Sequence, residues 1–147
     1  RGGAVDVFER PISVEPIVAR ITATLESRIA SPHYLGRRLD KYVRDNCAQQ
    51  DMSLSRLSRS FGISNGYASL LLRDGSWGGF RTRLAHHRVK QAKRLLMTTN
   101  EPLYTIADRC GFSSASRLSE TFGRFVGVTP KRYRELSADS VWEEESG

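Results

Sequence analysis

The sequence offers few side chains that could carry out catalysis or bind a metal. Its two cysteines, Cys47 and Cys110, and its three histidines share no spacing typical of a zinc site. His86 and His87 are adjacent, so on a helix they point in different directions. There is no Ser/His/Asp set and no glycine-rich phosphate loop. We therefore expect that the protein is not an enzyme and has no metal site or cofactor. The two cysteines are expected to be reduced thiols.

The distribution of charge indicates a different chemistry, the binding of a polyanion. The 147 residues carry a net charge of +7. Residues 51–136 hold 15 Lys and Arg against 6 Asp and Glu, whereas residues 137–147 have four acids and no base. Each phosphate that a basic side chain neutralises releases condensed counterions, which favours binding. No apolar run approaches the ~18 residues of a membrane helix. Charge alone does not separate DNA, RNA and an acidic membrane surface, and it is the motifs below that favour DNA as the partner, with no membrane.

An internal repeat supplies elements that would position these charges. The apolar pattern of residues 54–63 recurs 49 residues later, at residues 103–112. Farther downstream the offset is 50, so one residue has been inserted just after Gly111. A duplication of this size is typical of two copies of one supersecondary element.

Each copy has the pattern of a helix-turn-helix. Gly62 and Gly111 lie where a first helix would end in a left-handed conformation. Ser64 and Ser113 are placed to cap the helix that follows. In this motif the second helix leaves one face uncovered, and that face enters the major groove of DNA.

The segment between the copies predicts one long helix. Apolar residues recur at helical spacing from 80 to 97, with no proline or glycine inside. If both units enter one face of B-DNA, this helix would hold them about one turn, ~34 Å, apart. Its other face is basic and, with the start of the last helix, provides the candidate phosphate contacts. These are Arg81, Arg83, Lys90, Lys93, Lys131 and Arg132.

The N-terminal segment predicts an additional amphipathic helix within residues 16–30. Its stripe consists of Ile17, Ile21, Leu25 and Ile29, and it ends at Ser31-Pro32. The stripe needs a partner, which is this domain, a second chain, or an effector domain absent from the sequence. At the other end, the acidic tail has no apolar period and is expected to fray.

The second copy resembles a known family. Residues 106–114, then Phe122, Gly127-Val128-Thr129-Pro130 and Tyr133-Arg134, are similar to the C-terminal signature of AraC/XylS transcription regulators. The resemblance extends over residues 36–136 without a gap. It implies a seven-helix domain that binds promoter DNA, activation through RNA polymerase, and a cytoplasmic, nucleoid-associated location.

Together these patterns predict an all-α fold with two helix-turn-helix subdomains joined by a linker helix. The subdomains span residues 36–79 and 99–136, and the linker helix spans residues 80–98. An N-terminal extension of residues 1–35 with one helix precedes them, and an acidic tail of residues 137–147 follows.

The predicted function is sequence-specific recognition of double-stranded DNA by two recognition helices in adjacent major-groove segments. The resemblance places the base-reading positions at Gly66, Ser69, Leu70, Ala115, Ser116, Ser119 and Glu120. With their neighbours, the candidates on the first recognition helix are Ser64, Asn65, Gly66, Ser69, Leu70 and Arg73. Those on the second are Ser113, Ser114, Ala115, Ser116, Arg117, Ser119, Glu120 and Arg124.

This base-reading set is unusual, because strong base contacts normally come from Arg, Lys, Asn and Gln. It leaves open an alternative, a protein-interaction module that retains the fold but acts as an antagonist or co-regulator. We expect the second unit, which has Arg117 and Glu120, to contribute more of the discrimination between sequences.

Overall fold

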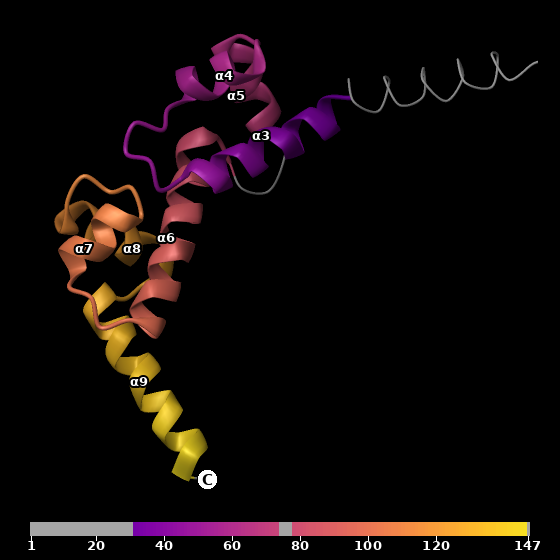
Figure 1. Ribbon diagram of the computed structural model, residues 1–147. Helices are drawn as coiled ribbons and strands as arrows, with labels where there is room; N and C mark the ends of the chain where they lie inside the picture. Colours follow the sequence, from indigo (N-terminus) through magenta and orange to yellow (C-terminus); the bar gives the residue numbers. More distant parts are fainter. Residues whose placement is uncertain (1–30, 74–77, 147) are drawn as a thin grey trace, which may run out of the picture.

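The computed structural model describes residues 31–73 and 78–146. Every regular element in these residues is an α-helix, which confirms the predicted all-α fold (Figure 1). The helices are α3 (Pro32–Asn46), α4 (Leu54–Phe61), α5 (Asn65–Arg73), α6 (Phe80–Thr98), α7 (Leu103–Arg109), α8 (Ala115–Val126) and α9 (Pro130–Ser146). The predicted N-terminal helix within residues 16–30 lies outside the described residues. None of the described helices is long and apolar enough to cross a bilayer.

The long helix α6 belongs to two separate hydrophobic cores. Phe80 and Leu84, in its first turns, are buried against α3, α4 and α5. Val89 and Leu96, farther along, are buried against α7 and α8. Figure 1 shows α3, α4 and α5 around one end of α6, α7 and α8 beside the rest of it, and α9 continuing past its other end. The linker is therefore a structural part of both subdomains.

The turn of each helix-turn-helix forms as the repeat predicts. Gly62 and Gly111 have positive φ angles of 65° and 86°, a region in which a side chain is strained. In each turn the next amide donates to a carbonyl five residues back, Ile63 at 3.0 Å and Phe112 at 2.9 Å. The two copies thus end their first helix in the same way.

The caps of the two recognition helices differ by one residue from the prediction. Ser64 Oγ accepts from the amide of Tyr67 at 3.1 Å, as predicted. In the second copy Ser114, not Ser113, caps the helix by accepting from the amide of Arg117 at 3.1 Å. The inserted residue precedes the cap, so the offset between the copies is already 50 at this point.

The last helix is longer than predicted, and the first described helix begins earlier. The first described helix begins at Pro32, ahead of the predicted subdomain start at residue 36, because proline suits the first turn of a helix. The last continues through Ser146, so the tail is helical and the expectation that it frays is wrong. No glycine or proline interrupts residues 131–146. Ser137 and Ser140 also donate back to carbonyls in the preceding turn, at 2.8 and 2.9 Å.

Candidate nucleic-acid interface

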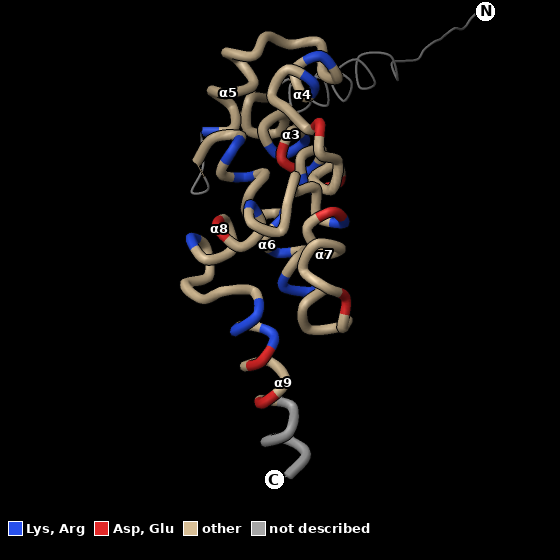
Figure 2. Tube along the Cα trace, turned by 90° about the vertical axis from the view of Figure 1, so that its left-hand side faces the viewer, with Lys and Arg blue, Asp and Glu red and all other residues tan. Residues whose placement is uncertain are grey.

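The two predicted recognition helices, α5 and α8, each bury one face and expose the other. Leu72 of α5 and Phe122 of α8 are fully buried in their respective cores. Figure 2 shows α5 and α8 one above the other on the same side of the molecule, with α4 and α7 on the opposite side in that view. The two recognition helices therefore lie on one side of the molecule.

The predicted residues of the first recognition helix are exposed, except Ser69, which is partly buried. Asn65 Nδ2 donates to Ser55 Oγ at 3.1 Å, so its amide is turned toward α4. Leu70 is 61% exposed, and Tyr67 is exposed beside it. Their spacing of three residues puts both side chains on one face of the helix. This face is more apolar than the predicted set suggested.

The second recognition helix carries a charged pair on its exposed face. Arg117 Nη1 lies 3.5 Å from Glu120 Oε2, and both side chains are more than 60% exposed. An exposed pair of this kind contributes only ~0–1 kcal/mol, so a ligand can displace it at little cost. Of the other predicted residues, Ala115 and Ser119 are partly buried. Exposed are Ser113, Ser114, Ser116 and Arg124.

A basic groove of about 380 Å³ lies between the two units. The first half of α6 contributes Arg81 and Arg88 to it, and the α7–α8 turn and α8 contribute Ser113 and Arg117. None of the described residues that line it is acidic. The fold thus brings together Arg81, Ser113 and Arg117, which belong to two different sets of predicted contacts.

The other predicted phosphate contacts vary in their availability. Lys90 and Lys131 are exposed. Arg132 is exposed and lies 3.6 Å from Glu135. Lys93 is partly buried, with its amine 5.9 Å from the centre of the Tyr133 ring.

Arg83 is not a surface residue, and its prediction as a phosphate contact is wrong. Its Nε donates to the carbonyl of Leu72 at 2.9 Å and to that of Gly78 at 3.3 Å. Its Nη1 donates to Asp40 Oδ1 at 3.0 Å, and His87 Nε2 lies 3.2 Å from the same oxygen. Burial raises the pKa of Asp40, but the hydrogen bonds and charges of Arg83 and His87 together outweigh burial. The pKa of Asp40 is therefore lower than its ordinary value. The guanidinium therefore binds a carbonyl in the last turn of α5 from inside the fold.

Two more arginines of the basic block have the same structural role. Arg88 Nε donates to the carbonyl of Cys47 at 2.8 Å, and its Nη2 to that of Gln49 at 2.9 Å. Arg134 donates to the last turn of α6 at 3.4 Å and to the carbonyl of Glu101 at 2.8 Å. Both satisfy carbonyls at or beyond helix ends that no amide of the helix can reach. Part of the positive surplus is therefore used within the fold.

The cysteines and histidines form no metal site in the part of the chain that the structure describes. Cys47 and Cys110 are free and buried. Burial raises the pKa of both thiols, that of Cys110 to about 12, so both are protonated at neutral pH.

Comparison with known sequences identifies relatives along most of the chain. The profile of a helix-turn-helix domain family matches residues 57–136. An uncharacterized HTH-type transcriptional regulator of Staphylococcus aureus is 39% identical over 85 residues, which are 58% of this chain and 11% of that protein. The melibiose operon regulatory protein of Escherichia coli is 26% identical over 126 residues, 84% of this chain and 41% of that protein. The chain thus spans less than half the length of these relatives.

Comparison with solved structures finds the same fold. The C-terminal domain of AraT, a response regulator from Geobacillus stearothermophilus, has a TM-score of 0.66 and 28% identity, over 69% of this chain and 84% of that one. The DNA-binding domain of AdpA, a global transcriptional factor solved in complex with a target DNA, has a TM-score of 0.64 and 25% identity. That match covers 69% of this chain and 90% of the AdpA domain.

Proposed function

This chain belongs to the AraC-type family of helix-turn-helix transcription regulators, and we propose that it inserts α5 and α8 into adjacent segments of the major groove. The family is one of DNA-binding domains, not of enzymes. The observation that carries the proposal is that both helices lie on one side of the molecule (Figure 2) and that a basic groove lies between the units.

The exposed residues of the two helices suit different kinds of base contact. On α5, the apolar face of Tyr67 and Leu70 fits a thymine methyl group. On α8, Glu120 could accept from a cytosine amino group, and Arg117 could donate to guanine once their pair opens. We therefore expect α8 to contribute more hydrogen-bonded discrimination and α5 more apolar contact.

The phosphates between the two groove segments would lie in the basic groove. Arg81 and Arg117 face this space from α6 and α8, and Ser113 adds a hydroxyl donor. Lys90 on α6 and Lys131 at the start of α9 are exposed for further contacts. Contacts of this kind set the register of the protein on the duplex, while the recognition helices read the bases.

Selection from a randomised double-stranded DNA library tests the proposal. We expect a consensus with two elements about one helical turn apart, bound at least ~10³-fold more tightly than scrambled DNA at physiological salt. A ratio near one, together with a steep dependence on salt, would contradict sequence-specific binding. Transcription in vitro from a promoter with the selected site would then show whether the full protein activates RNA polymerase or represses it.

A second candidate, a protein-interaction module, is favoured by one specific observation. Asn65 is bonded to Ser55, and Arg117 is paired with Glu120, so three polar side chains suited to base contacts already have a partner in the fold. Under this candidate the exposed Leu70 would pack against another protein. A library selection that yields no consensus would exclude sequence-specific DNA binding. Binding of a regulator partner that Leu70→Ser leaves unchanged would exclude the second candidate.

A further inference from the structure

The two helix-turn-helix units touch each other directly, in addition to sharing α6. Gln50, which follows α3 in the first unit, donates through Nε2 to the carbonyl of Phe112 at 3.2 Å and to Asp108 Oδ1 at 3.3 Å. Gly111, in the turn of the second unit, lies closer still to the backbone of the first unit. A Cβ placed on Gly111 would lie 2.5 Å from the carbonyl oxygen of Cys47. The turn of the second unit therefore packs on the backbone of the first.

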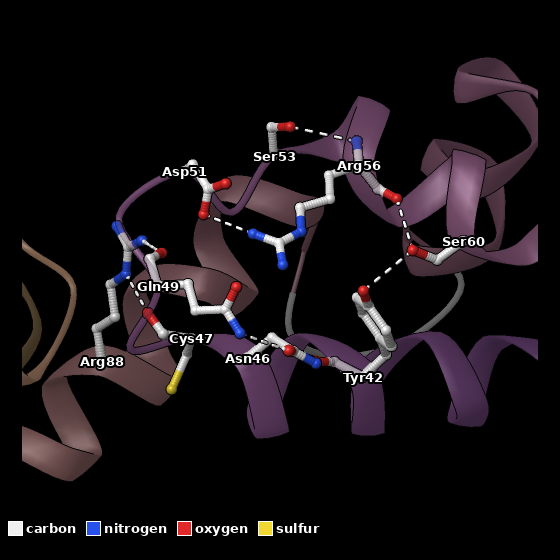
Figure 3. Close-up of polar contacts among 9 residues, drawn as sticks. All are labelled: Tyr42, Asn46, Cys47, Gln49, Asp51, Ser53, Arg56, Ser60 and Arg88. Atoms are coloured by element: carbon white, nitrogen blue, oxygen red, sulfur yellow. Dashed lines mark hydrogen bonds and ion pairs between the residues drawn. The ribbon is translucent and has the colours of Figure 1, made fainter.

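Arg88 joins the same two surfaces from α6. Its guanidinium binds the carbonyls of Cys47 and Gln49, as Figure 3 shows. The carbon of the same guanidinium lies 5.8 Å from the centre of the Phe112 ring, within the range of a cation–π contact. One side chain thus contacts the first unit through hydrogen bonds and the second through its aromatic residue.

The segment of the first unit that takes part is itself firmly attached to α3 and α4 (Figure 3). Gln49 Nε2 donates to Asn46 Oδ1 at 2.8 Å. The ion pair between Arg56 Nη1 and Asp51 Oδ1, at 2.5 Å, ties the end of the segment to α4. The segment is therefore connected to α3 and α4, and Met52, directly after it, is buried in the core to which α5 also contributes.

Such a contact matters because of where the two cores meet on α6. The last α6 residue buried in the first core is Leu84, and the first buried in the second core is Val89. Residues 85–88 between them are only partly buried. Without a second connection at this level, the two units could rock about this single turn of helix.

We propose that the contact of Cys47–Gln50 with Gly111–Phe112 sets the separation and angle of α5 and α8, and so determines which half-site spacing the protein accepts. This inference rests on the proposed DNA binding. Gly111, Gln50 and Arg88 are positioning residues in it, and none of them needs to touch a base. Each base pair added between half-sites rotates one by about 35° relative to the other, which a rigid pair of units cannot follow.

The repeat offers a matched pair of substitutions, Gly111→Ala and Gly62→Ala. Both glycines have positive φ angles, so alanine introduces similar backbone strain at each. At Gly62 the added Cβ meets nothing within 4 Å, whereas at Gly111 it meets the carbonyl of Cys47. A third variant, Gln50→Glu, introduces no backbone strain and places a carboxylate beside Asp108 on the exposed side of the contact.

The first measurement needs no DNA. Spin labels on Leu70→Cys and Ser116→Cys report the distance between α5 and α8, because both positions are exposed and the two native thiols are buried. We expect Gly111→Ala and Gln50→Glu to shift or broaden the distance distribution, and Gly62→Ala to match the parent. If Gly111→Ala does not fold, Gln50→Glu decides alone. Distributions for Gln50→Glu and Gly62→Ala that both match the parent would overturn the proposal.

The second measurement uses unlabelled chains and the selected site with one to three base pairs inserted between its halves. The parent and Gly62→Ala should lose about tenfold or more in affinity for each insertion, a loss comparable to a mismatched base pair. Gln50→Glu should lose much less, because its units can adjust. Equal losses in all variants would contradict the role in spacing. The absence of any preferred site would instead contradict the proposed function, and the distance measurement would remain valid.

Discussion

Replacing Arg83 by alanine is expected to weaken the fold and to leave the number of contacted phosphates unchanged. The side chain is 9% exposed and makes two hydrogen bonds of good length, to the carbonyl of Leu72 at 2.9 Å and to Asp40 at 3.0 Å. A hydrogen bond with a charged partner contributes about 1.5–3 kcal/mol. Asp40 keeps its contact with His87 and is 32% exposed, so water replaces part of the loss.

These terms give a loss of about 3 kcal/mol in the free energy of unfolding for Arg83→Ala, or roughly 10 °C in Tm. Urea denaturation followed by circular dichroism measures the first quantity directly. The matched control is Arg81→Ala, two positions earlier on α6, where the side chain is exposed. We expect this control to unfold within about 0.5 kcal/mol of the parent.

In DNA binding, Arg81→Ala should show an effect on the salt dependence and Arg83→Ala should show none. Loss of one phosphate contact reduces the slope of log K against log salt by about 0.9. Arg81→Ala should show this reduction, while Arg83→Ala should keep the parent slope at temperatures where it is folded. Unchanged stability with a reduced slope for Arg83→Ala would refute the reasoning, because it would place the guanidinium on the DNA.

Three further outcomes are expected. The folded-state pKa of Asp40 lies below its ordinary value of 3.8, so its contribution to stability is present at neutral pH and is lost as the pH falls below about 4. In urea denaturation between about pH 3 and 7, the free energy of unfolding of Asp40→Asn should therefore change less with pH than that of the parent, and an equal change in both would contradict this. Glu120→Gln should tighten binding to random DNA several-fold in fluorescence anisotropy, because it removes an acid 3.5 Å from Arg117; equal affinity would remove Glu120 from the interface. Cys47 and Cys110 should react with a thiol reagent at pH 8 only as fast as the fold opens, since burial raises both pKa values; immediate reaction would show that they are accessible.

The repeat could be predicted from the sequence because its signals are local. Gly62 and Gly111 mark left-handed turns that other residues disfavour, and Ser64 caps its helix from an adjacent position. Hydrophobic periodicity likewise predicts the extent of α6 from Phe80 to Thr98. In each case the physical cause lies within a few residues of the signal.

The roles of the arginines could not be predicted in the same way. Arg81 and Arg83 are the same residue type on the same helix, and the charge pattern treats them alike. Arg83 follows Phe80 by three positions and precedes Leu84, which places it toward the first core. Whether such an arginine is buried depends on which carbonyls lie near it in the fold. The carbonyl that Arg83 binds at 2.9 Å, that of Leu72, belongs to another helix. That information exists only in the folded chain.

The two units, equivalent in the repeat, are unequal in the structure, and this difference bears on recognition. Gly62 and Gly111 obey one local rule, but only Gly111 also packs against the other unit. The turn that positions α8 is therefore the turn that orients α8 relative to α5. If the two helices are held at one separation, DNA must match or adopt that geometry, and the energy of deforming it depends on sequence. A protein with few strong base-reading side chains can then still discriminate between sites, with junction residues contributing selectivity although they contact no base.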